Sequence, residues 1–379
     1  MADDHDQGPL AETPLASVHA ASGARMVPFA GYAMPVQYAS GILSEHAWTR
    51  GHAGLFDVSH MGQAVLQGPG FEATALALET LVAADILGLR PGQQRYTQLL
   101  NEEGGIFDDL MVARPAEPER DGQILLVVNA STKEQDYRLV AAAMPDGIEL
   151  RRLDDRALLA LQGPDAAAVL DPLAPGAAAM PFMSSSALAV GGVVAQVSRS
   201  GYTGEDGYEI SVAAADAAGL WSRLASDARV RPIGLGARDS LRLEAGLPLY
   251  GHDINQETSP VEAGLAWSVG RRRRAAGGFP GQIRILQELA EGPLRRRIGL
   301  LVEGRAPARE HAEIVDGAGE LVGKITSGGY GPSVGAPIAM GYVVAEFANP
   351  DTALGVVVRG RTLAARVAPL PFWPHRYKR

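Results

Sequence analysis

Asp108 and Asp109 are adjacent carboxylates, a pair of residues that can support acid–base chemistry at a binding site. They follow a polar Asn-Glu-Glu-Gly-Gly turn at residues 101–105, which predicts a hairpin whose second strand re-enters the core through both aspartates. Neighbouring residues on a strand point to opposite faces, so only one of the two can enter a given pocket. The alternative is that both are turn carboxylates without a chemical role.

Glu209 lies in the middle of a predicted strand. Tyr208 and Ile210 would share one face of that strand, and Glu209 and Ser211 the other. A carboxylate buried on a nearly apolar sheet needs a partner, because burying it unpaired is costly. Arg238 could be that partner in a purely structural ion pair, or it could simply begin a helix.

Residue type and spacing exclude several other kinds of site. The chain has no cysteine, which excludes disulfides, thiolate metal sites, cysteine-held iron–sulfur clusters and cysteine nucleophiles. His46 and His52 do not share a helical face, and none of the histidines has metal-ligand spacing, so we expect no metal. The sequence contains neither a Walker phosphate loop nor a Gly-x-Ser-x-Gly elbow, and residues 329–335 lack the setting of a dinucleotide fingerprint.

An internal repeat indicates which elements position these residues. Leu-Gln-Gly-Pro occurs at residues 66–69 and again at 161–164, each time after an apolar stretch and before a helix-forming one. Each copy then reaches a second strand followed by a helix, at 124–128 in the first and at 208–212 in the second. We therefore expect an α+β body of two related halves, with mixed or antiparallel sheets, around a pseudo-symmetric core.

The two matching inner strands carry candidate residues. Asn129 ends the strand of the first half, and Glu209 lies within that of the second. Ser131 and Glu134 have the spacing of a capping box, which predicts the start of the helix that follows Asn129.

The C-terminal part predicts a separate small β-barrel. Short β-like segments alternate there with glycine-rich turns, at 298–302, 313–315, 321–325, 339–344, 355–358 and 361–367. The last stretch, 371–377, is aromatic and is expected to pack back onto the body. The predicted division is an N-terminal extension (1–12), the body (13–275), a linker (276–292) and the barrel (293–379).

Composition and charge restrict the partners. The chain has 379 residues and a net charge of −9, which argues against nucleic acid as a partner. No apolar run is long enough to cross a bilayer, and no export signal begins the sequence, so we expect a cytoplasmic protein. Two arginine runs, 271–274 and 295–297, are either solvated turns or a docking surface for an acidic partner.

Five segments are dense in glycine, aromatic and acidic residues: 26–38, 54–62, 96–112, 200–210 and 236–246. Together they resemble the glycine cleavage T-protein family, and the resemblance runs from about Thr13 through Tyr377. It also includes residues 250–254, 260–265 and 338–343. No single string is decisive, but their order, spacing and completeness are specific.

The resemblance implies an aminomethyltransferase. Members of this family transfer the methylene of an aminomethyl-dihydrolipoyl arm, carried by the lipoylated H-protein, to tetrahydrofolate and release ammonia. By that resemblance Asp109 is the acid–base residue, Glu209 binds the pterin, and Arg238 holds the pterin or the glutamate. The same comparison makes Tyr96, Tyr202, Met61, Asn129 and Tyr377 residues that line or border the folate slot, and places Arg297 near the entrance for the lipoyl arm.

Other functions on the same fold are the alternatives. A folate-dependent demethylase of another small methyl donor would have a similar slot. The folate domains of dimethylglycine or sarcosine dehydrogenases follow a flavin domain, for which this chain has no room. The related iron–sulfur assembly factor has a cysteine in its signature, and this sequence has none.

Overall fold

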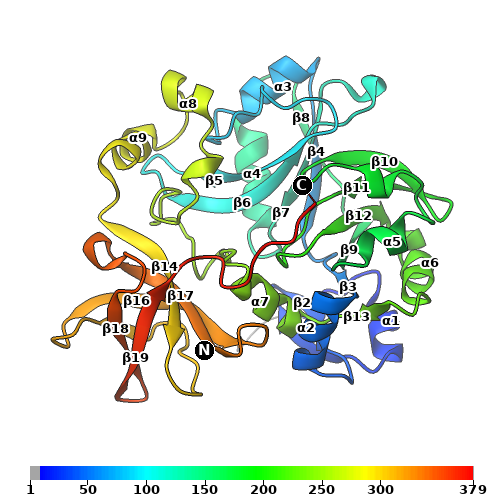
Figure 1. The fold of residues 1–379 in the computed structure, drawn as a ribbon. Helices are drawn as coiled ribbons and strands as arrows, with labels where there is room; N and C mark the ends of the chain where they lie inside the picture. The colour runs from blue at the N-terminus through cyan, green and yellow to red at the C-terminus, as the bar shows by residue number, and fades with distance from the viewer. Residues whose placement is uncertain (1–8, 379) are drawn as a thin grey trace.

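Two β-sheets face each other and a barrel lies beside them in the computed structural model, which describes residues 9–378 (Figure 1). Most of the predicted N-terminal extension, residues 1–12, therefore lies outside the described residues. Among the described residues no helix has both the length and the apolar character to span a membrane.

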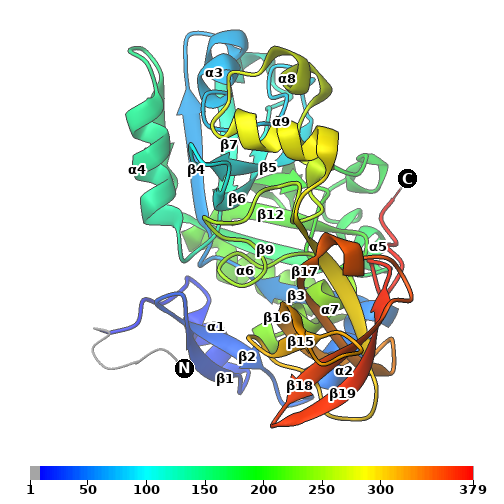
Figure 2. The ribbon, with the colours of Figure 1, turned by 90° about the vertical axis from the view of Figure 1, so that its left-hand side faces the viewer.

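The first sheet is formed by one half of the body. Its strands lie in the order β5 (Gln94–Leu100), β6 (Ile106–Ala113), β7 (Gln123–Val128), β4 (Gly62–Gln67) and β8 (Glu149–Arg152). Helices α3 (Phe71–Leu78) and α4 (Lys133–Ala143) cover its outer face (Figure 2). There Tyr137 and Val140 belong to the same apolar core as Leu110 and Leu126. The inner face is left to the second sheet.

The second sheet repeats this arrangement. Its order is β10 (Ser185–Val190), β11 (Val193–Ser198), β12 (Gly207–Ala213), β9 (Arg156–Gln162), β3 (Ala53–Asp57) and β13 (Val230–Pro232). Helices α5 (Ala166–Leu170) and α6 (Ala214–Ala225) pack on its outer face. The order β10-β11-β12-β9 matches β5-β6-β7-β4, which confirms the predicted duplication.

Strand β3 departs from this symmetry. It belongs to the N-terminal part of the chain but is inserted into the sheet of the second half, antiparallel to β9 and parallel to β13. Ala53 pairs with Val230, and Gly54 pairs with Gln162. All residues of β3 are buried, as an interior strand with both faces covered requires.

A buried ionic cluster joins the N-terminal elements to the end of the chain. These elements are α1 (Ala16–Ala21), β1 (Arg25–Phe29), β2 (Tyr32–Gln37) and α2 (Ile42–Gly51), and α2 packs on α7 (Leu235–Glu244). Arg50 of α2 forms ion pairs with Glu205 at 2.7 Å and Glu244 at 2.9 Å. Arg376 pairs with the same Glu205 at 2.7 Å, and Trp373 N donates to the Glu244 carbonyl oxygen at 2.9 Å. The C-terminal stretch thus packs onto the body as predicted.

The C-terminal domain is a closed six-stranded barrel, as the sequence predicted. Its order is β14 (Arg295–Val302), β17 (Ala336–Val344), β16 (Leu321–Gly331), β15 (Glu313–Val315), β18 (Ala353–Val358) and β19 (Arg361–Ala368). Every expected segment is part of a strand, because alternation and glycine-rich turns are local signals. The predicted linker, 276–292, contains helix α9 (Gln282–Glu291). The domain boundaries themselves remain a prediction.

The predicted capping box is wrong. Helix α4 begins at Lys133 after the N-cap Thr132, and no side chain caps it. Glu134 binds Arg152 instead, with both carboxylate oxygens at 2.8 Å from guanidinium nitrogens. The Glu134 carboxylate, which would complete the capping box, is held in a bidentate ion pair instead.

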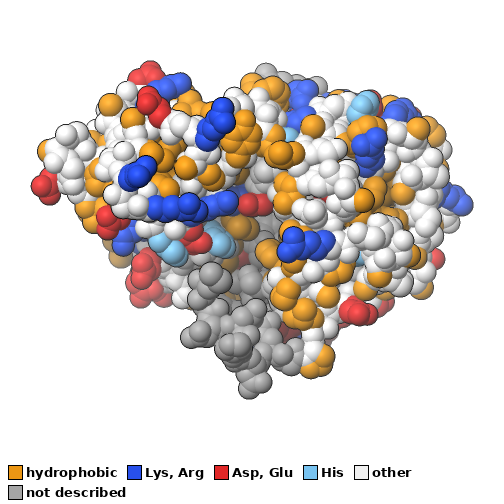
Figure 3. Space-filling model, turned by 90° about the horizontal axis from the view of Figure 1, so that it is seen from below, with side chains coloured by type: hydrophobic (Ala, Val, Ile, Leu, Met, Phe, Trp, Pro, Cys, Tyr) orange, Lys and Arg blue, Asp and Glu red, His pale blue; other side chains and the backbone are white. Residues whose placement is uncertain are grey.

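The arginine runs contact other segments of the chain. The first forms helix α8 (Arg271–Ala276), where Arg272 binds Asp85 at 2.8 Å and Arg273 donates to the Glu79 carbonyl oxygen at 2.6 Å. In the second run, Arg295 binds Glu262 at 3.0 Å. On the face shown in Figure 3, basic and acidic side chains are interspersed and do not form one continuous basic patch.

Candidate active site

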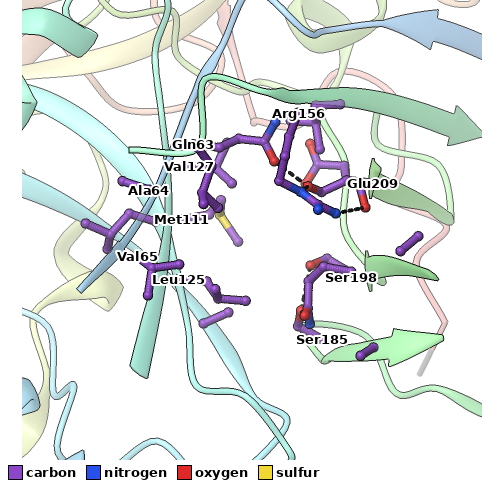
Figure 4. A pocket seen from close by; sticks show the side chains of 18 of the residues that line it. Gln63, Ala64, Val65, Met111, Leu125, Val127, Arg156, Ser185, Ser198 and Glu209 are labelled. Atoms are coloured by element: carbon purple, nitrogen blue, oxygen red, sulfur yellow. Dashed lines mark hydrogen bonds between the residues drawn. The ribbon is translucent and has the colours of Figure 1, made fainter. Parts of the chain in front are cut away.

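A cavity of about 310 Å³ lies between the inner faces of the two sheets. The first sheet lines it with the apolar Val65, Met111, Leu125 and Val127 and with the polar Gln63 (Figure 4). The polar residues of the second sheet at the cavity include Ser185, Ser198, Arg156 and Glu209. The duplicated halves therefore enclose a space with both apolar and polar surfaces.

Asp109 lies on the inner face of β6, two residues before Met111 of the cavity wall. Tyr96 Oη donates to its Oδ2 at 2.9 Å, and Asn129 Nδ2 donates to its Oδ1 at 2.7 Å. Two predicted residues from β5 and from the end of β7 thus fix both carboxylate oxygens. As predicted from strand alternation, Asp108 points to the opposite face, together with Leu110.

The hairpin that carries the two aspartates is held by a close backbone contact. Asn101 Nδ2 donates to the Gln256 carbonyl oxygen at 2.9 Å, and Gly105 N donates to Asn101 Oδ1 at 2.7 Å. A Cβ on Gly105 would lie 1.7 Å from that carbonyl oxygen, so only glycine fits. The polar turn that predicted the hairpin also fixes its position.

The surroundings of Asp109 disfavour its charged form. Burial is the largest cause, the negative charge of Asp108 is the next, and together they raise the pKa of Asp109 to about 7. Burial and the nearby Asp109 charge also raise the pKa of Tyr96 well above its usual range. A carboxyl with a pKa near neutrality can both accept and release a proton, as general acid–base catalysis requires.

Glu209 lines the cavity from β12, on the face that the strand pattern predicted. Ser200 Oγ donates to its Oε2 at 2.7 Å. The half-buried Arg238 of α7 is close enough for the charge of Glu209 to act on its pKa, which the larger effect of desolvation lowers. Arg238 Nη1 has no hydrogen-bond partner within residues 9–378, so this donor is available to a ligand.

Aromatic and sulfur-containing side chains lie around these polar groups. The Arg238 guanidinium lies 4.8 Å from the centre of the Tyr202 ring, whose hydroxyl donates to the Pro248 carbonyl oxygen. Met61, in the loop before β4, packs in the same apolar cluster as Val127 of the cavity wall. Such flat and polarisable surfaces suit an aromatic ligand.

Trp267 and Asp136 are site residues that the sequence reasoning missed. The Trp267 ring stacks on Tyr96 with 5.5 Å between centroids and is 64% exposed, so it borders the site from the solvent side. It follows the 260–265 segment of the resemblance, which was the available signal. Asp136 lies behind Asp108 on α4, where the neighbouring apolar residues suggested only a packed helix.

Two predicted residues lie apart from this group. Arg297 of β14 donates to the Ala263 carbonyl oxygen at 2.8 Å and the Gly246 carbonyl oxygen at 2.9 Å, and so ties the barrel to the body. Tyr377 stacks on Phe182 with 4.3 Å between centroids. Neither makes a recorded contact with Asp109 or Glu209 within the described part of the chain, so their roles at the site stay predictions.

The arrangement suits a flat polar ligand whose reacting atom lies near Asp109. Glu209 lines the cavity, the charge of Glu209 acts on the nearby Arg238, and Tyr96, stacked on Trp267, donates to Asp109. In residues 9–378 no group of His, Cys, Asp or Glu side chains has a geometry that could hold a metal ion.

Comparisons with known proteins match both parts of the chain. Residues 15–273 match the family model of the GCVT N-terminal domain, and residues 295–374 match that of the glycine cleavage T-protein C-terminal barrel domain. The chain is 44% identical to the probable mitochondrial aminomethyltransferase of Schizosaccharomyces pombe, over 97% of this chain and 95% of that protein. It is also 44% identical to the human mitochondrial aminomethyltransferase, over 97% and 91% of the two chains.

A solved structure shares the same fold along its length. The glycine cleavage system aminomethyltransferase T from Bartonella henselae superposes with a TM-score of 0.91 at 41% identity, and covers 98% of this chain and 100% of that one.

The names of these relatives contradict one expectation. We expected a cytoplasmic protein from the lack of an export signal, and that prediction is wrong. The relatives from Schizosaccharomyces pombe, Flaveria pringlei and human are named mitochondrial enzymes, not cytoplasmic ones. Location depends on addressing signals that composition and core-forming patterns do not report.

Proposed function

This chain belongs to the glycine cleavage T-protein family and is an aminomethyltransferase, and we propose that its substrates are tetrahydrofolate and an aminomethyl-lipoyl carrier of the H-protein type. The methylene carbon loses its bonds to the dihydrolipoyl sulfur and to the amino group and forms bonds to two folate nitrogens. The two protons that these nitrogens lose end on ammonia and on the freed thiol. The observation that carries the proposal is a pair of carboxylates on the inner faces of the two sheets. Glu209 lines the cavity, and Asp109 lies on β6 two residues before Met111 of the cavity wall.

The residues present fit a folate. A pterin offers a ring N–H beside an exocyclic amino group, and the carboxylate of Glu209 can accept from both. One guanidinium nitrogen of Arg238 has no partner in the described part of the chain, and it can donate to an oxygen of the pterin or to the glutamate. We propose that Tyr96, Tyr202, Met61 and Asn129 line the same slot, with Tyr377 at its border.

Tetrahydrofolate supplies the amine that accepts the methylene. The part of this chain is to place a carboxyl near that amine, and we propose that Asp109 is this group. Its pKa of about 7 allows Asp109 to be ionised as positive charge develops at the transferring carbon, and then to take up a proton. The hydrogen bonds from Tyr96 and Asn129 hold both oxygens in place, so no reorientation is needed.

We propose that the carrier approaches beside the contact between barrel and body. Arg297 lies there, joined to carbonyl oxygens of the body. Since the chain is acidic overall, a local basic residue would help to attract an acidic carrier. An Arg297→Ala variant should raise the KM for the carrier more than the KM for tetrahydrofolate.

The test is a reconstituted reaction. The purified chain is mixed with tetrahydrofolate and an H-protein that has been loaded with the aminomethyl group, and methylenetetrahydrofolate and ammonia are measured. We expect both products in equal amounts, and only when all three components are present. No product with a carrier known to be loaded would reject the proposed substrates and turn the search to methyl donors.

A further inference from the structure

Asp136 is a buried carboxyl that the proposed reaction does not yet use. It lies on α4, is fully buried, and neither of its oxygens accepts a hydrogen bond within the described residues. Its nearest polar neighbours are the Asp108 carboxyl and Thr132. The Thr132 hydroxyl lies near both carboxyls and lowers the pKa of each, but its one hydrogen can instead be donated to the Asn129 carbonyl oxygen at 3.3 Å. A carboxylate in this position would carry an uncompensated buried charge.

Asp108 has the opposite environment. It is also fully buried, but it accepts from Asn129 N at 3.0 Å and from Asn129 Nδ2 at 2.8 Å. Two carboxyl groups in contact cannot both ionise in a buried site, and the one that receives donors keeps the charge. Burial raises the pKa of Asp108 as well, but the donors of Asn129 and the neighbouring Asp136 carboxyl lower it. Asp136 receives no donor within the described residues, so Asp136 is the carboxyl of the pair that favours the proton.

The same asparagine connects this pair to the proposed base. Asn129 Nδ2 donates to Asp108 Oδ1 and also to Asp109 Oδ1, at 2.8 and 2.7 Å. A shift of Asp108 would therefore move the amide that holds Asp109. The chain of contacts runs from Asp136 through Asp108 and Asn129 to Asp109.

We propose that Asp136 is a positioning residue for the transfer reaction: its neutral carboxyl donates to Asp108, which keeps one negative charge and holds Asn129 against Asp109. This inference rests on the proposed function, since it takes Asp109 as the acid–base group. Its consequence is that Asp109 faces one neighbouring negative charge at neutral pH and not two.

The surrounding titratable groups agree with this distribution of charge. Asp108 and Asp109 approach Asp136 from β6, Tyr137 lies on the same helix, and Tyr250 approaches from the loop after α7. Burial and the Asp108 charge raise the pKa of Asp136 to about 9. A tyrosine is neutral at pH 7, so none of these four groups supplies a positive charge that would let Asp136 ionise there.

Two substitutions at position 136 test whether a hydrogen-bond donor toward Asp108 is needed there. Asp136→Asn keeps a donor toward Asp108, and Asp136→Ala removes it. Glu134→Gln is the control, since Glu134 is exposed on the same helix and pairs only at the surface with Arg152 at 2.8 Å. The kcat, the KM for tetrahydrofolate and the pH profile of kcat are measured for each variant.

We expect Asp136→Asn and the control to stay within threefold of the wild-type kcat. Asp136→Ala should lower kcat at least tenfold with a KM within threefold. The acid limb of the pH profile of kcat should also move to lower pH in Asp136→Ala. In that variant Asp108 binds the proton itself, and its charge no longer raises the pKa of Asp109. Equal activity of the alanine and asparagine variants, whether both high or both low, would overturn the proposal.

A second measurement does not depend on activity. The infrared difference spectrum of wild type minus Asp136→Asn, taken at pH 7, should contain the carbonyl stretch of a protonated carboxylic acid. A spectrum without that band would overturn the proposal even if Asp136→Ala fails to fold. If the wild type shows no turnover, the proposed function fails, while the infrared result still decides the protonation of Asp136.

Discussion

Replacing Asp109 by asparagine removes the proposed base and leaves its surroundings nearly unchanged. The carboxylate accepts from Tyr96 at 2.9 Å and from Asn129 at 2.7 Å, and an amide of the same shape can still accept one of these bonds. General acid–base catalysis contributes roughly 10²- to 10⁴-fold to a rate. We therefore expect kcat to fall at least tenfold, which corresponds to about 1.4 kcal/mol on the barrier.

The pH dependence gives a sharper test of the same change. Because the base must be ionised, wild-type kcat should rise with pH through about 7, the pKa to which burial and the Asp108 charge raise Asp109. In Asp109→Asn this limb should disappear and kcat should stay low over the same range. Initial rates of methylenetetrahydrofolate formation with saturating carrier, at half-unit steps of pH, measure both profiles.

The control is Glu103→Gln, which removes a charge from the exposed turn of the same hairpin. It should leave kcat and its pH profile unchanged, and tetrahydrofolate should bind to both variants within threefold of wild type by titration calorimetry. An Asp109→Asn enzyme with wild-type turnover, or with an intact acid limb, would refute the assignment of Asp109 as the base.

Three further changes test other parts of the site and its support. Glu209→Ala should weaken tetrahydrofolate binding at least tenfold by calorimetry while the melting temperature stays within a few degrees; unchanged binding would exclude the pterin role. Arg50→Met removes the cation that pairs with both buried carboxylates, so that Glu205 keeps only Arg376 and Glu244 only His46, and urea unfolding should show a loss of about 3–5 kcal/mol; a loss below about 1 kcal/mol would contradict the importance of that cluster. Asp136 has a raised pKa, so the native state holds a proton that the unfolded state releases, and wild-type stability falls as pH rises toward about 9. Between about pH 5 and 8 the Asp136→Asn variant should gain on wild type by roughly 1.4 kcal/mol per pH unit, and parallel stability curves would argue against a protonated Asp136.

Local patterns predicted the parts of this fold that depend on neighbouring residues. The barrel strands follow alternating apolar residues between glycine turns, and the hairpin of Asp108 and Asp109 follows a polar turn fixed by Gly105. The opposite orientation of the two aspartates is a property of any strand. These features needed no knowledge of the rest of the chain.

Features that depend on distant segments could not be predicted in this way. The capping box failed because Arg152 of the next strand competes for Glu134. The sequence did not indicate that Asp136 lies near Asp108 or that Trp267 stacks on Tyr96, because each contact joins residues that are distant in the sequence. The roles assigned to individual site residues came from the family resemblance, and they still await the tests above.

The insertion of β3 into the second half has a consequence for synthesis on the ribosome. Ala53 pairs with Val230, which is made 177 residues later. At about 5–20 residues per second, this strand waits roughly 10 to 35 s for its partner. Leu55 and Phe56, fully buried in the final sheet, first wait for β9, whose residues 156–162 are made about 100 residues after β3, and then for β13. The nascent chain therefore keeps an unpaired apolar strand available to chaperones during this time, and β3 cannot reach its final place before about 60% of the protein has been made.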